Sequence, residues 1–212
     1  MKLSWKNRRE VQKRNPKVTI CIPAYNQEIL TRKALESIPE RDDIEVIVVD
    51  DNSTDSTLQT VLSFWQGTSL DMRVVHRIEN GGISNAYNRA YDMAQGEYIY
   101  QLDCDDYLFT DRFERAMEQL DGTDIVYVAA ETNDGTILMP SEGNHNLCAG
   151  WFKFIRRDFM KDIRRPINAY GGDYEMNLEM ISRPHSSKYT ELCVYHYNYP
   201  REGSVIWELT HK

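Results

Sequence analysis

The chain is organised around Gly96-Glu97-Tyr98-Ile99-Tyr100-Gln101-Leu102-Asp103-Cys104-Asp105-Asp106-Tyr107-Leu108. Its apolar run predicts a buried strand that ends in three carboxylates, at a sheet edge where open α/β folds bind ligands. Like charges this close raise one another's pKa values and destabilise the fold unless a cation lies among them. Because Mg²⁺ and Mn²⁺ prefer such oxygen ligands, the pattern indicates a metal–diphosphate site. Turn or helix-cap positions on a solvated loop remain the alternative for Asp103 and Asp105.

Length and charge limit the classes of protein that this chain can represent. With 212 residues, 41% of them hydrophobic, it can bury a full core, which predicts a single domain. A net charge of −8 argues against a surface that binds nucleic acid throughout. Residues 1–17 are the exception: seven Lys or Arg against one Glu give +6 and leave −14 for the remainder. This basic segment either contacts an anionic membrane or polymer, or is simply a solvated terminus.

The N-terminal segment also bears on localisation. Its four apolar residues are too few for a signal peptide or a membrane span. The four cysteines are far apart and form no Cys-x-x-Cys pair, which favours reduced thiols over disulfides or a zinc site. We therefore expect a cytoplasmic protein with no transmembrane segment, one that the basic segment could place peripherally at a membrane surface.

Strand and helix patterns alternate along the chain. Besides the acidic strand, apolar runs predict strands at Val18–Pro23, Ile44–Val49, Val74–Val75 and Asp124–Ala130. Apolar residues at helical spacing predict four helices between and after them, with faces that include Ile29 and Leu35, Val61 and Trp65, Tyr87 and Tyr91, and Phe113 and Met117. Expected caps for the last three are Thr54 or Asp55, Ser84, and Asp111. The pattern is parallel α/β up to about residue 130 and mixed or antiparallel beyond it, where Asn133-Asp134-Gly135 predicts a hairpin turn.

A glycine turn, Asn80-Gly81-Gly82, precedes the third predicted helix. Glycines before a helix N-terminus can let backbone N–H groups approach a phosphate. The turn is not the Gly-x-Gly-x-x-Gly fingerprint, and a tight strand-to-helix connection accounts for it at least as well.

Five motifs occur in order and at strand ends: Ile20-Cys21-Ile22-Pro23-Ala24-Tyr25-Asn26, Val48-Val49-Asp50-Asp51-Asn52-Ser53-Thr54-Asp55, Asn80-Gly81-Gly82, Gly96-Glu97-Tyr98-Ile99 and Leu102-Asp103-Cys104-Asp105-Asp106. Together they resemble the GT-A glycosyltransferases of family 2. Two later blocks are similar to the family's acidic motif and C-terminal strand and loop: Tyr170-Gly171-Gly172-Asp173-Tyr174-Glu175, and Tyr195-His196-Tyr197-Asn198-Tyr199 with Gly203-Ser204-Val205.

The resemblance implies a Rossmann-like GT-A fold, an α/β domain whose mostly parallel sheet is flanked by helices and whose C-terminal part is mixed or antiparallel. We expect the basic segment 1–17, then one domain over 18–212. Residues 18–130 would form the nucleotide-sugar-binding half and residues 131–212 the acceptor-binding half. Since the chain ends soon after its C-terminal strand, we expect a compact soluble transferase rather than a membrane-embedded synthase.

The implied reaction is a metal-dependent, inverting transfer of a sugar from a nucleoside diphosphate sugar, foremost a UDP-sugar, to an acceptor hydroxyl. Tyr25 would lie against the base of the nucleotide. Asp51, ranked ahead of Asp50, would accept a hydrogen bond from that base. Asp103 would lie at the ribose or a metal-bound water, and Asp105 would bind the Mn²⁺ or Mg²⁺ ion that neutralises the leaving diphosphate.

Asp173 is the expected general base, because only a base opposite the leaving diphosphate assists an inverting displacement. Glu175 is its rival, but two positions along a helix it points about 200° away. Without the resemblance, Asp173 would be a helix cap. His196 is an expected additional metal ligand, with a satisfied histidine on a sheet as the alternative.

Three further residues have weaker expected roles. Arg201 would contact the diphosphate bidentately, or lie solvated in a loop. Trp151 would lie near the acceptor, or pack in the core. Asp106 would be a cap or an outer-shell residue.

Two positions depart from the family pattern. Tyr87 stands where the family often has an arginine before Asn88, and Gly172 precedes Asp173 where an acidic pair is common. Neither change removes a group that the chemistry requires.

The acceptor is open at this stage. A saccharide or lipid-linked sugar is the most common for such folds, while a protein or a modified nucleobase in DNA is rarer. The acidic body disfavours DNA, but the basic segment 1–17 leaves it open. A sugar-nucleotide-binding protein without catalysis is a different class, against which Asp173 argues. A nucleotidyltransferase ranks third, because Pro23-Ala24-Tyr25-Asn26 is not a glycine-rich basic loop.

Overall fold

The computed structural model describes residues 15–141, 149–167 and 172–202. Most of the basic segment, Cys148, Tyr170-Gly171 and Gly203-Ser204-Val205 therefore lie outside the described residues. Within the described ranges, no helix combines the length and apolarity that crossing a bilayer requires.

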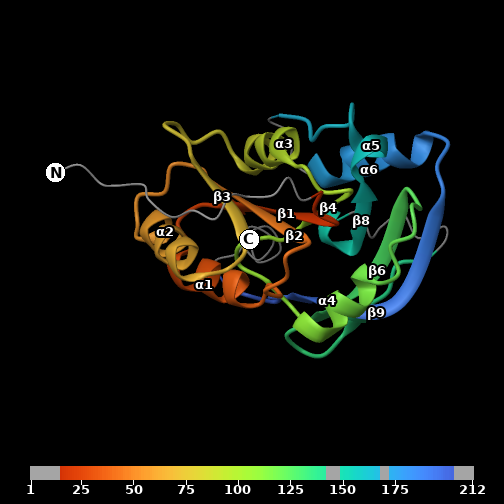
Figure 1. Cartoon of the computed structure of the whole chain (residues 1–212), viewed down its shortest axis with the longest axis horizontal. Coiled ribbons are helices and arrows are strands. Elements are labelled where there is room, and N and C mark those ends of the chain that lie inside the picture. Colours follow the sequence, from red (N-terminus) through yellow and green to blue (C-terminus); the bar gives the residue numbers. More distant parts are fainter. Residues whose placement is uncertain (1–14, 142–148, 168–171, 203–212) are drawn as a thin grey trace.

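One sheet of nine strands forms the centre of the molecule, in the order β3-β2-β1-β4-β8-β6-β9-β5 with β7 paired to β6 (Figure 1). The strands are β1 (Val18–Ala24), β2 (Ile44–Asp50), β3 (Asp71–His76), β4 (Tyr98–Gln101), β5 (Tyr107–Leu108), β6 (Ile125–Thr132), β7 (Ile137–Leu138), β8 (Lys153–Arg156) and β9 (Ser187–Tyr197). The helices are α1 (Glu28–Glu36), α2 (Thr57–Gly67), α3 (Ile83–Met93), α4 (Thr110–Met117), α5 (Arg157–Met160) and α6 (Gly172–Ser182), with a 3₁₀ turn η1 (Gly150–Phe152).

The sheet has a parallel half and a mixed half, as predicted. Strands β3, β2, β1 and β4 are parallel neighbours. Next to β4, β8 runs antiparallel to both β4 and β6, while β9 is parallel to β6 and antiparallel to β5. The sequence patterns did not predict β8, a short strand that inserts between two strands preceding it in the chain.

Both faces of the sheet are covered by helices. Because side chains alternate along a strand, Ile20 and Ile22 pack on one face with α1, α2 and α4, and Cys21 packs on the other with α3 and α6. Figure 1 shows α3, α5 and α6 on the side opposite α1 and α2. The strands buried on both faces explain why their sequences read as continuous apolar runs.

Several local expectations need correction. Ile29 is 81% exposed, so it is not part of the core face of α1. Ser84 lies inside α3, because Gly82 with φ of 81° takes the cap position that favours glycine. Asp111 lies in the first turn of α4 rather than at its cap. The N-cap of α2 is Ser56 rather than Thr54 or Asp55, although Asp55 accepts a hydrogen bond from Thr57 N–H at 2.9 Å.

A buried carboxylate joins the strands of the parallel half. Glu45 on β2 is fully buried and accepts hydrogen bonds from Thr19 Oγ1 on β1 (2.6 Å) and from Gln95 N–H before β4 (2.8 Å), and it pairs with Arg73 on β3. Gly96 N–H donates to Thr19 Oγ1 at 2.8 Å. Since a buried charge is tolerated only when paired and hydrogen-bonded, this network requires a close approach of the turn before β4 to β1.

Gly96→Ala tests that close approach. A Cβ atom at Gly96 would lie 2.5 Å from Thr19 N and 2.8 Å from Val18 C, both backbone atoms that cannot move aside. We expect the free energy of unfolding to fall by about 1–3 kcal/mol, the usual cost of overpacking, in urea denaturation. Gly67→Ala is the matched control, since no atom lies within 4 Å of its added Cβ. Equal stability of the two variants would contradict this account.

Candidate active site

The loops after β1 and β2 meet at one edge of the sheet. Asn26, with φ of 49°, accepts a hydrogen bond from Thr54 N–H at 2.8 Å through its side chain, and its own N–H donates to Ser53 Oγ at 3.1 Å. This clamp leaves the neighbouring Tyr25 ring 46% exposed at the end of β1. An exposed aromatic face at a strand end is a suitable surface for a flat ligand.

Asp51 and Asp50 point to different elements. The nearly buried Asp51 carboxylate accepts hydrogen bonds from the N–H groups of Gly81 (3.1 Å) and Gly82 (2.7 Å), and it pairs with Arg77 at 2.8 Å. Asp50 instead lies 2.7 Å from Nδ1 of His76 on β3. Asp51 therefore holds the glycine turn before α3. The N–H groups of Gly81 and Gly82 have a protein carboxylate as their acceptor, so the turn does not need a bound phosphate to satisfy them.

The three carboxylates after β4 each have a partner from a distant segment. Tyr87 on α3 donates its hydroxyl to Asp103 Oδ1 at 2.6 Å. Tyr195 on β9 donates its hydroxyl to Asp106 Oδ2 at 2.5 Å, and Asn198 N–H donates to the other oxygen at 2.8 Å. Asp106 is buried with both oxygens occupied, which makes it a link between β4 and β9.

Burial and mutual repulsion raise the pKa values of two of these carboxyl groups. Burial is the largest cause for Asp103, followed by the charges of Asp105 and Asp173, and together they raise its pKa to about 7. Burial, followed by the charges of Asp103 and Asp105, also raises the pKa of Asp106 well above its usual range. A cation at this point would relieve that repulsion.

Asp105 pairs with Arg201, from the loop after β9. Both side chains are partly exposed, and within the described part of the chain Arg201 Nε is buried without a hydrogen-bond acceptor. The guanidinium thus occupies the position of a counter-charge for the acidic cluster. Among the described residues, no three His, Cys, Asp or Glu side chains gather into a ready-made metal site. The donor set of Asp105 with Asp103 fits a divalent cation that substrate phosphates complete, the usual arrangement for Mg²⁺.

Arg165 connects the acidic cluster with Asp173. Its side chain is 5% exposed, pairs with Asp173 and donates to Gln101 Oε1 at 2.6 Å. Its guanidinium carbon lies 4.1 Å from the centre of the Tyr87 ring, whose hydroxyl bonds Asp103. In sequence, Tyr87 stands where the resemblance leads one to expect an arginine. In space, the guanidinium of Arg165, from another segment, packs on the Tyr87 ring and supplies the positive charge. The sequence gives no signal for Arg165, because an Arg-Arg pair before a proline is normally solvent-exposed.

Asp173 lies in the first turn of α6, at the edge of this network. The structure brings it together with Asp103 through Arg165 and Tyr87. Glu175 is exposed, and no ion pair ties it to Arg165 within the described residues. Asp173, rather than Glu175, thus belongs to the network.

The structure corrects the prediction that His196 binds a metal together with Asp105. Its ring stacks on Tyr107 at 4.2 Å with an interplanar angle of 11°, whereas the preceding Tyr195 contacts Asp106. Because side chains alternate along β9, His196 points to the face opposite the aspartates. Burial lowers the pKa of His196, and the positive charge of Lys33 lowers it further.

Trp151 is a core residue in this structure. It is 6% exposed and stacks on Tyr195 with ring centres 4.6 Å apart, and its carbonyl oxygen accepts a hydrogen bond from the Tyr100 hydroxyl at 2.7 Å. It supports the tyrosine that holds Asp106, so packing explains its position.

The family model for "Glycosyl transferase family 2" matches residues 19–173, which include the ends of β1, β2 and β4 and the start of α6. The chain belongs to glycosyl transferase family 2. Its fold is that of the GT-A glycosyltransferases, since it superposes on S. aureus TarS 1-349 in complex with UDP-GlcNAc with a TM-score of 0.78. That superposition covers 89% of this chain and 60% of TarS 1-349 at 24% identity. The mannosyltransferase PcManGT from Pyrobaculum calidifontis, in complex with GDP-Man and Mn²⁺, superposes with a TM-score of 0.73 over 97% of this chain and 64% of its own, at 22% identity.

Curated relatives of this family 2 chain are larger proteins. The chondroitin synthase of Pasteurella multocida is 38% identical over 108 residues, 50% of this chain and 11% of the synthase. The GalNAc(5)-diNAcBac-PP-undecaprenol beta-1,3-glucosyltransferase of Campylobacter jejuni is 30% identical over 132 residues, 61% of this chain and 40% of that protein. The chain thus spans less than half the length of either relative.

Asp103→Asn tests the electrostatic account of the acidic cluster. A carboxyl whose folded pKa is about 7 and whose unfolded pKa is about 3.9 loses its stabilising contribution as the pH rises from about 4 to about 7. Asparagine removes this dependence and still accepts the Tyr87 hydrogen bond. In metal-free urea denaturation, we expect the variant to gain roughly 2 kcal/mol relative to wild type between about pH 4 and about pH 7. Asp71→Asn, at an exposed position on β3, is the control; a parallel pH profile for Asp103→Asn and wild type would refute the account.

Proposed function

We propose that this family 2 glycosyltransferase transfers a sugar, with inversion, from a UDP-sugar to a hydroxyl of a saccharide or glycoconjugate acceptor, with Mn²⁺ or Mg²⁺ as cofactor. The observation that carries the proposal is the network joining Asp173, from one segment, to Asp103, from another, through Arg165 and Tyr87. An inverting displacement needs a base and a leaving-group site on opposite sides of the reacting carbon, supplied by separate parts of the chain.

The donor would bind along the edge formed by the ends of β1, β2 and β4. Tyr25 is exposed and would lie against the base, and Asp51, which holds the glycine turn, would accept a hydrogen bond from the base. Asp103 would contact the ribose or a metal-bound water. The related structures of TarS contain UDP or UDP-GlcNAc and that of PcManGT contains GDP-Man, which supports a nucleotide-sugar donor.

Asp105, with Asp103 beside it, would hold the divalent cation. When bound, Mg²⁺ or Mn²⁺ supplies Lewis-acid neutralisation of the charge on the departing diphosphate. Arg201 is the counter-charge of Asp105 in this structure. If a cation took the place of Arg201 beside Asp105, the Arg201 guanidinium would be free to bind two oxygens of the diphosphate bidentately.

Asp173 would take the proton from the acceptor hydroxyl. Its ion pair with the buried Arg165 would fix the position of the carboxylate. A general base needs such a fixed position because it must face one acceptor hydroxyl. Relatives named for undecaprenol-linked and poly(ribitol-phosphate) acceptors support a saccharide or glycoconjugate acceptor over a nucleobase in DNA.

A nucleotide-release assay tests this function. Purified protein with Mn²⁺ and a panel of UDP-, GDP-, dTDP- and CMP-sugars should release free nucleotide from one donor. We expect Asp173→Asn to lower turnover by about 10²–10⁴-fold while donor binding persists, since general-base catalysis contributes that much. Asp105→Ala should lose metal-dependent donor binding as well. Glu175→Gln, an exposed carboxylate two residues from the base, is the matched control and should keep wild-type turnover.

Calorimetry on the same panel separates the failures. One outcome is that the wild type binds a donor in the presence of metal but shows no turnover even when acceptors are supplied, and that Asp173→Asn behaves in the same way. This outcome would identify a non-catalytic sugar-nucleotide-binding protein. No binding of any donor would refute the proposed function.

A further inference from the structure

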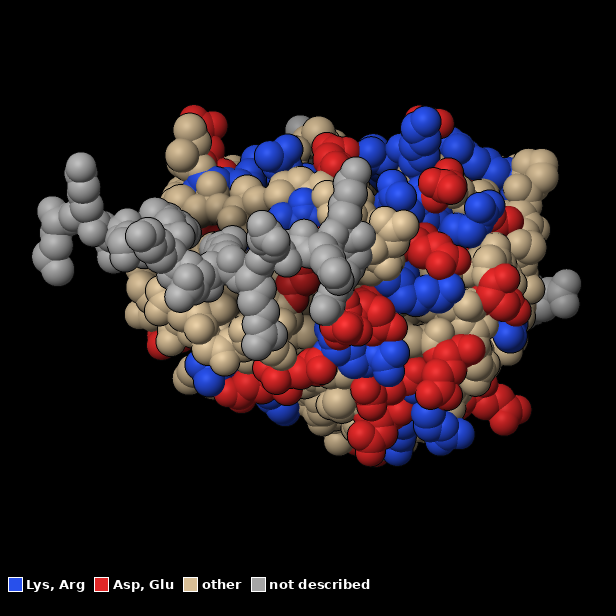
Figure 2. Space-filling view, in the orientation of Figure 1, with Lys and Arg blue, Asp and Glu red and all other residues tan. Residues whose placement is uncertain are grey.

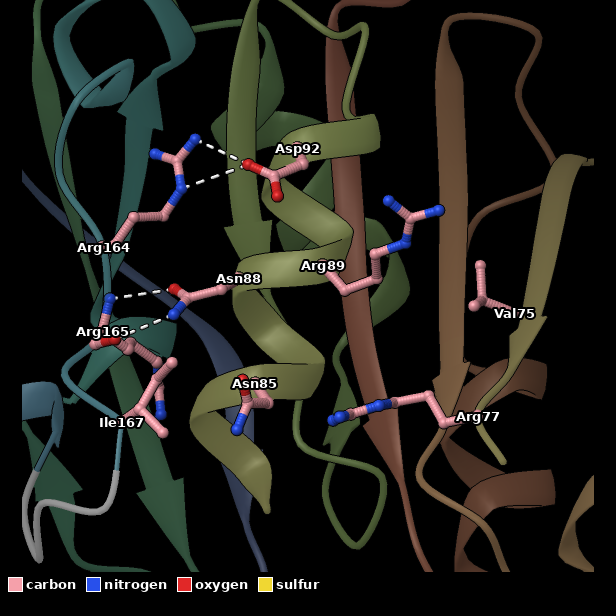
Figure 3. A pocket seen from close by; sticks show the side chains of 9 residues that line it. All are labelled: Val75, Arg77, Asn85, Asn88, Arg89, Asp92, Arg164, Arg165 and Ile167. Atoms are coloured by element: carbon pink, nitrogen blue, oxygen red, sulfur yellow. Dashed lines mark hydrogen bonds and ion pairs between the residues drawn. The ribbon is translucent and has the colours of Figure 1, made fainter. Parts of the chain in front are cut away.

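A second concave surface, which we call the α3 trough, lies along the outer face of α3 and has a volume of about 520 Å³. Figure 3 shows α3 as its floor, with Arg77 on one flank and the segment that carries Arg164 and Arg165 on the other. The residues that matter are Arg77, Asn85, Arg89, Asp92, Arg164 and Arg165. None of the trough's lining residues carries a role in the transfer reaction as a base or a metal ligand.

The α3 trough is basic in a protein of net charge −8. Four arginines and one acid, Asp92, line it. Figure 2 shows Lys and Arg prominent along the upper edge on the side of α5, whereas Asp and Glu are mixed with Lys and Arg along the lower edge. A surface on which arginines predominate favours an anion.

The four guanidinium groups differ in how far they are already committed to partners within the protein. Arg77 and Arg165 are committed to Asp51 and Asp173. Arg89 is exposed, and within the described residues it has neither an ion pair nor a hydrogen bond from its side chain. Arg164 donates through Nη1 to the carbonyl oxygens of Lys161 (2.9 Å) and Ile163 (2.8 Å), and through Nη2 to Asp92 at 2.7 Å. The Asp92 carboxylate is 52% exposed, so a ligand can compete with Asp92 for the Nη2 side of Arg164 at little cost.

The α3 trough starts at the candidate active site. Asn85 marks its end near Arg77 and Arg165, the two residues tied to Asp51 and Asp173 (Figure 3). From there to Asp92, seven residues of helix extend about 10 Å. A chain that presents a hydroxyl to Asp173 can therefore reach Arg89 and Arg164 with a group one or two sugar units away.

Resting on the proposed function, we propose that the α3 trough binds a phosphate or carboxylate group of the acceptor, which makes the substrate an anionic glycan. The guanidinium fork matches these oxyanions in shape and charge, and it binds them bidentately. A volume of about 520 Å³ suits a short segment of a single chain.

Fluorescence anisotropy without donor or metal tests the trough directly. The labelled probes are a glycerol phosphate oligomer, an oligogalacturonate and a neutral maltooligosaccharide of equal length. We expect wild type to bind an anionic probe and not the neutral one. Arg89→Gln should weaken that binding about tenfold, the loss of one charge-assisted contact. Asp92→Asn should tighten it about threefold, because the Nε and Nη2 donors of Arg164 then lose their charged partner, while Nη1 stays bonded to the backbone.

Arg115→Gln is the matched control, an exposed helical arginine on α4 that also lacks a side-chain partner among the described residues. It should bind the probes like wild type. Equal binding of the neutral probe, or equal loss in Arg89→Gln and Arg115→Gln, would overturn the proposal. Arg89-dependent binding of duplex DNA in preference to the oligomers would overturn it in favour of a nucleic acid. Comparison of the two anionic probes identifies the oxyanion.

This experiment separates the two proposals. Donor binding is measured on the same wild-type protein by calorimetry with UDP-sugars. If no donor binds but an anionic oligomer does so in an Arg89-dependent way, the proposed transfer is wrong and the anion site stands. If a donor binds and no oligomer does, the transfer stands and the α3 trough proposal fails.

Discussion

Repulsion among the carboxylates that follow β4 is the constraint on which the rest of the structure depends. Asp103, Asp105 and Asp106 lie within four positions, and the loop can persist only if each finds a partner. The partners come from α3, from β9 and from the loop after β9. The C-terminal half of the chain is thus attached to the parallel half through the side chains of this acidic loop.

Arg165 is a second case of a buried charge whose partners come from distant segments, and it connects Asp173 with the acidic loop after β4. A buried guanidinium is costly unless its donors are satisfied, and this one is met by Asp173, by Gln101 and by the face of Tyr87. The departure from the family pattern at Tyr87 is therefore compensated in space, because the positive charge arrives from a different segment. A site can keep its electrostatics while it changes which residue supplies them.

The surface repeats this division of charge on a larger scale. Acidic groups at the strand ends favour a cation and its diphosphate, while the α3 trough beside them presents arginines on its floor and both flanks (Figures 2 and 3). Two of those arginines also hold Asp51 and Asp173 in place. Under the proposed function, these opposite electrostatic fields would let a donor and an anionic acceptor bind on separate surfaces without competing.

The sequence by itself determined the family, the alternation of strands and helices in the parallel half, and the acidic strand end, because these are local patterns of apolar spacing and short motifs. Only the tertiary structure decided the position of β8, the exposure of Ile29, the direction of His196 and the role of Arg165. Each of these depends on a contact between segments far apart in the chain. A residue's spacing along a strand or helix predicts which neighbours share its face, but which distant segment packs there is settled by the folded core and the pairing of its buried charges.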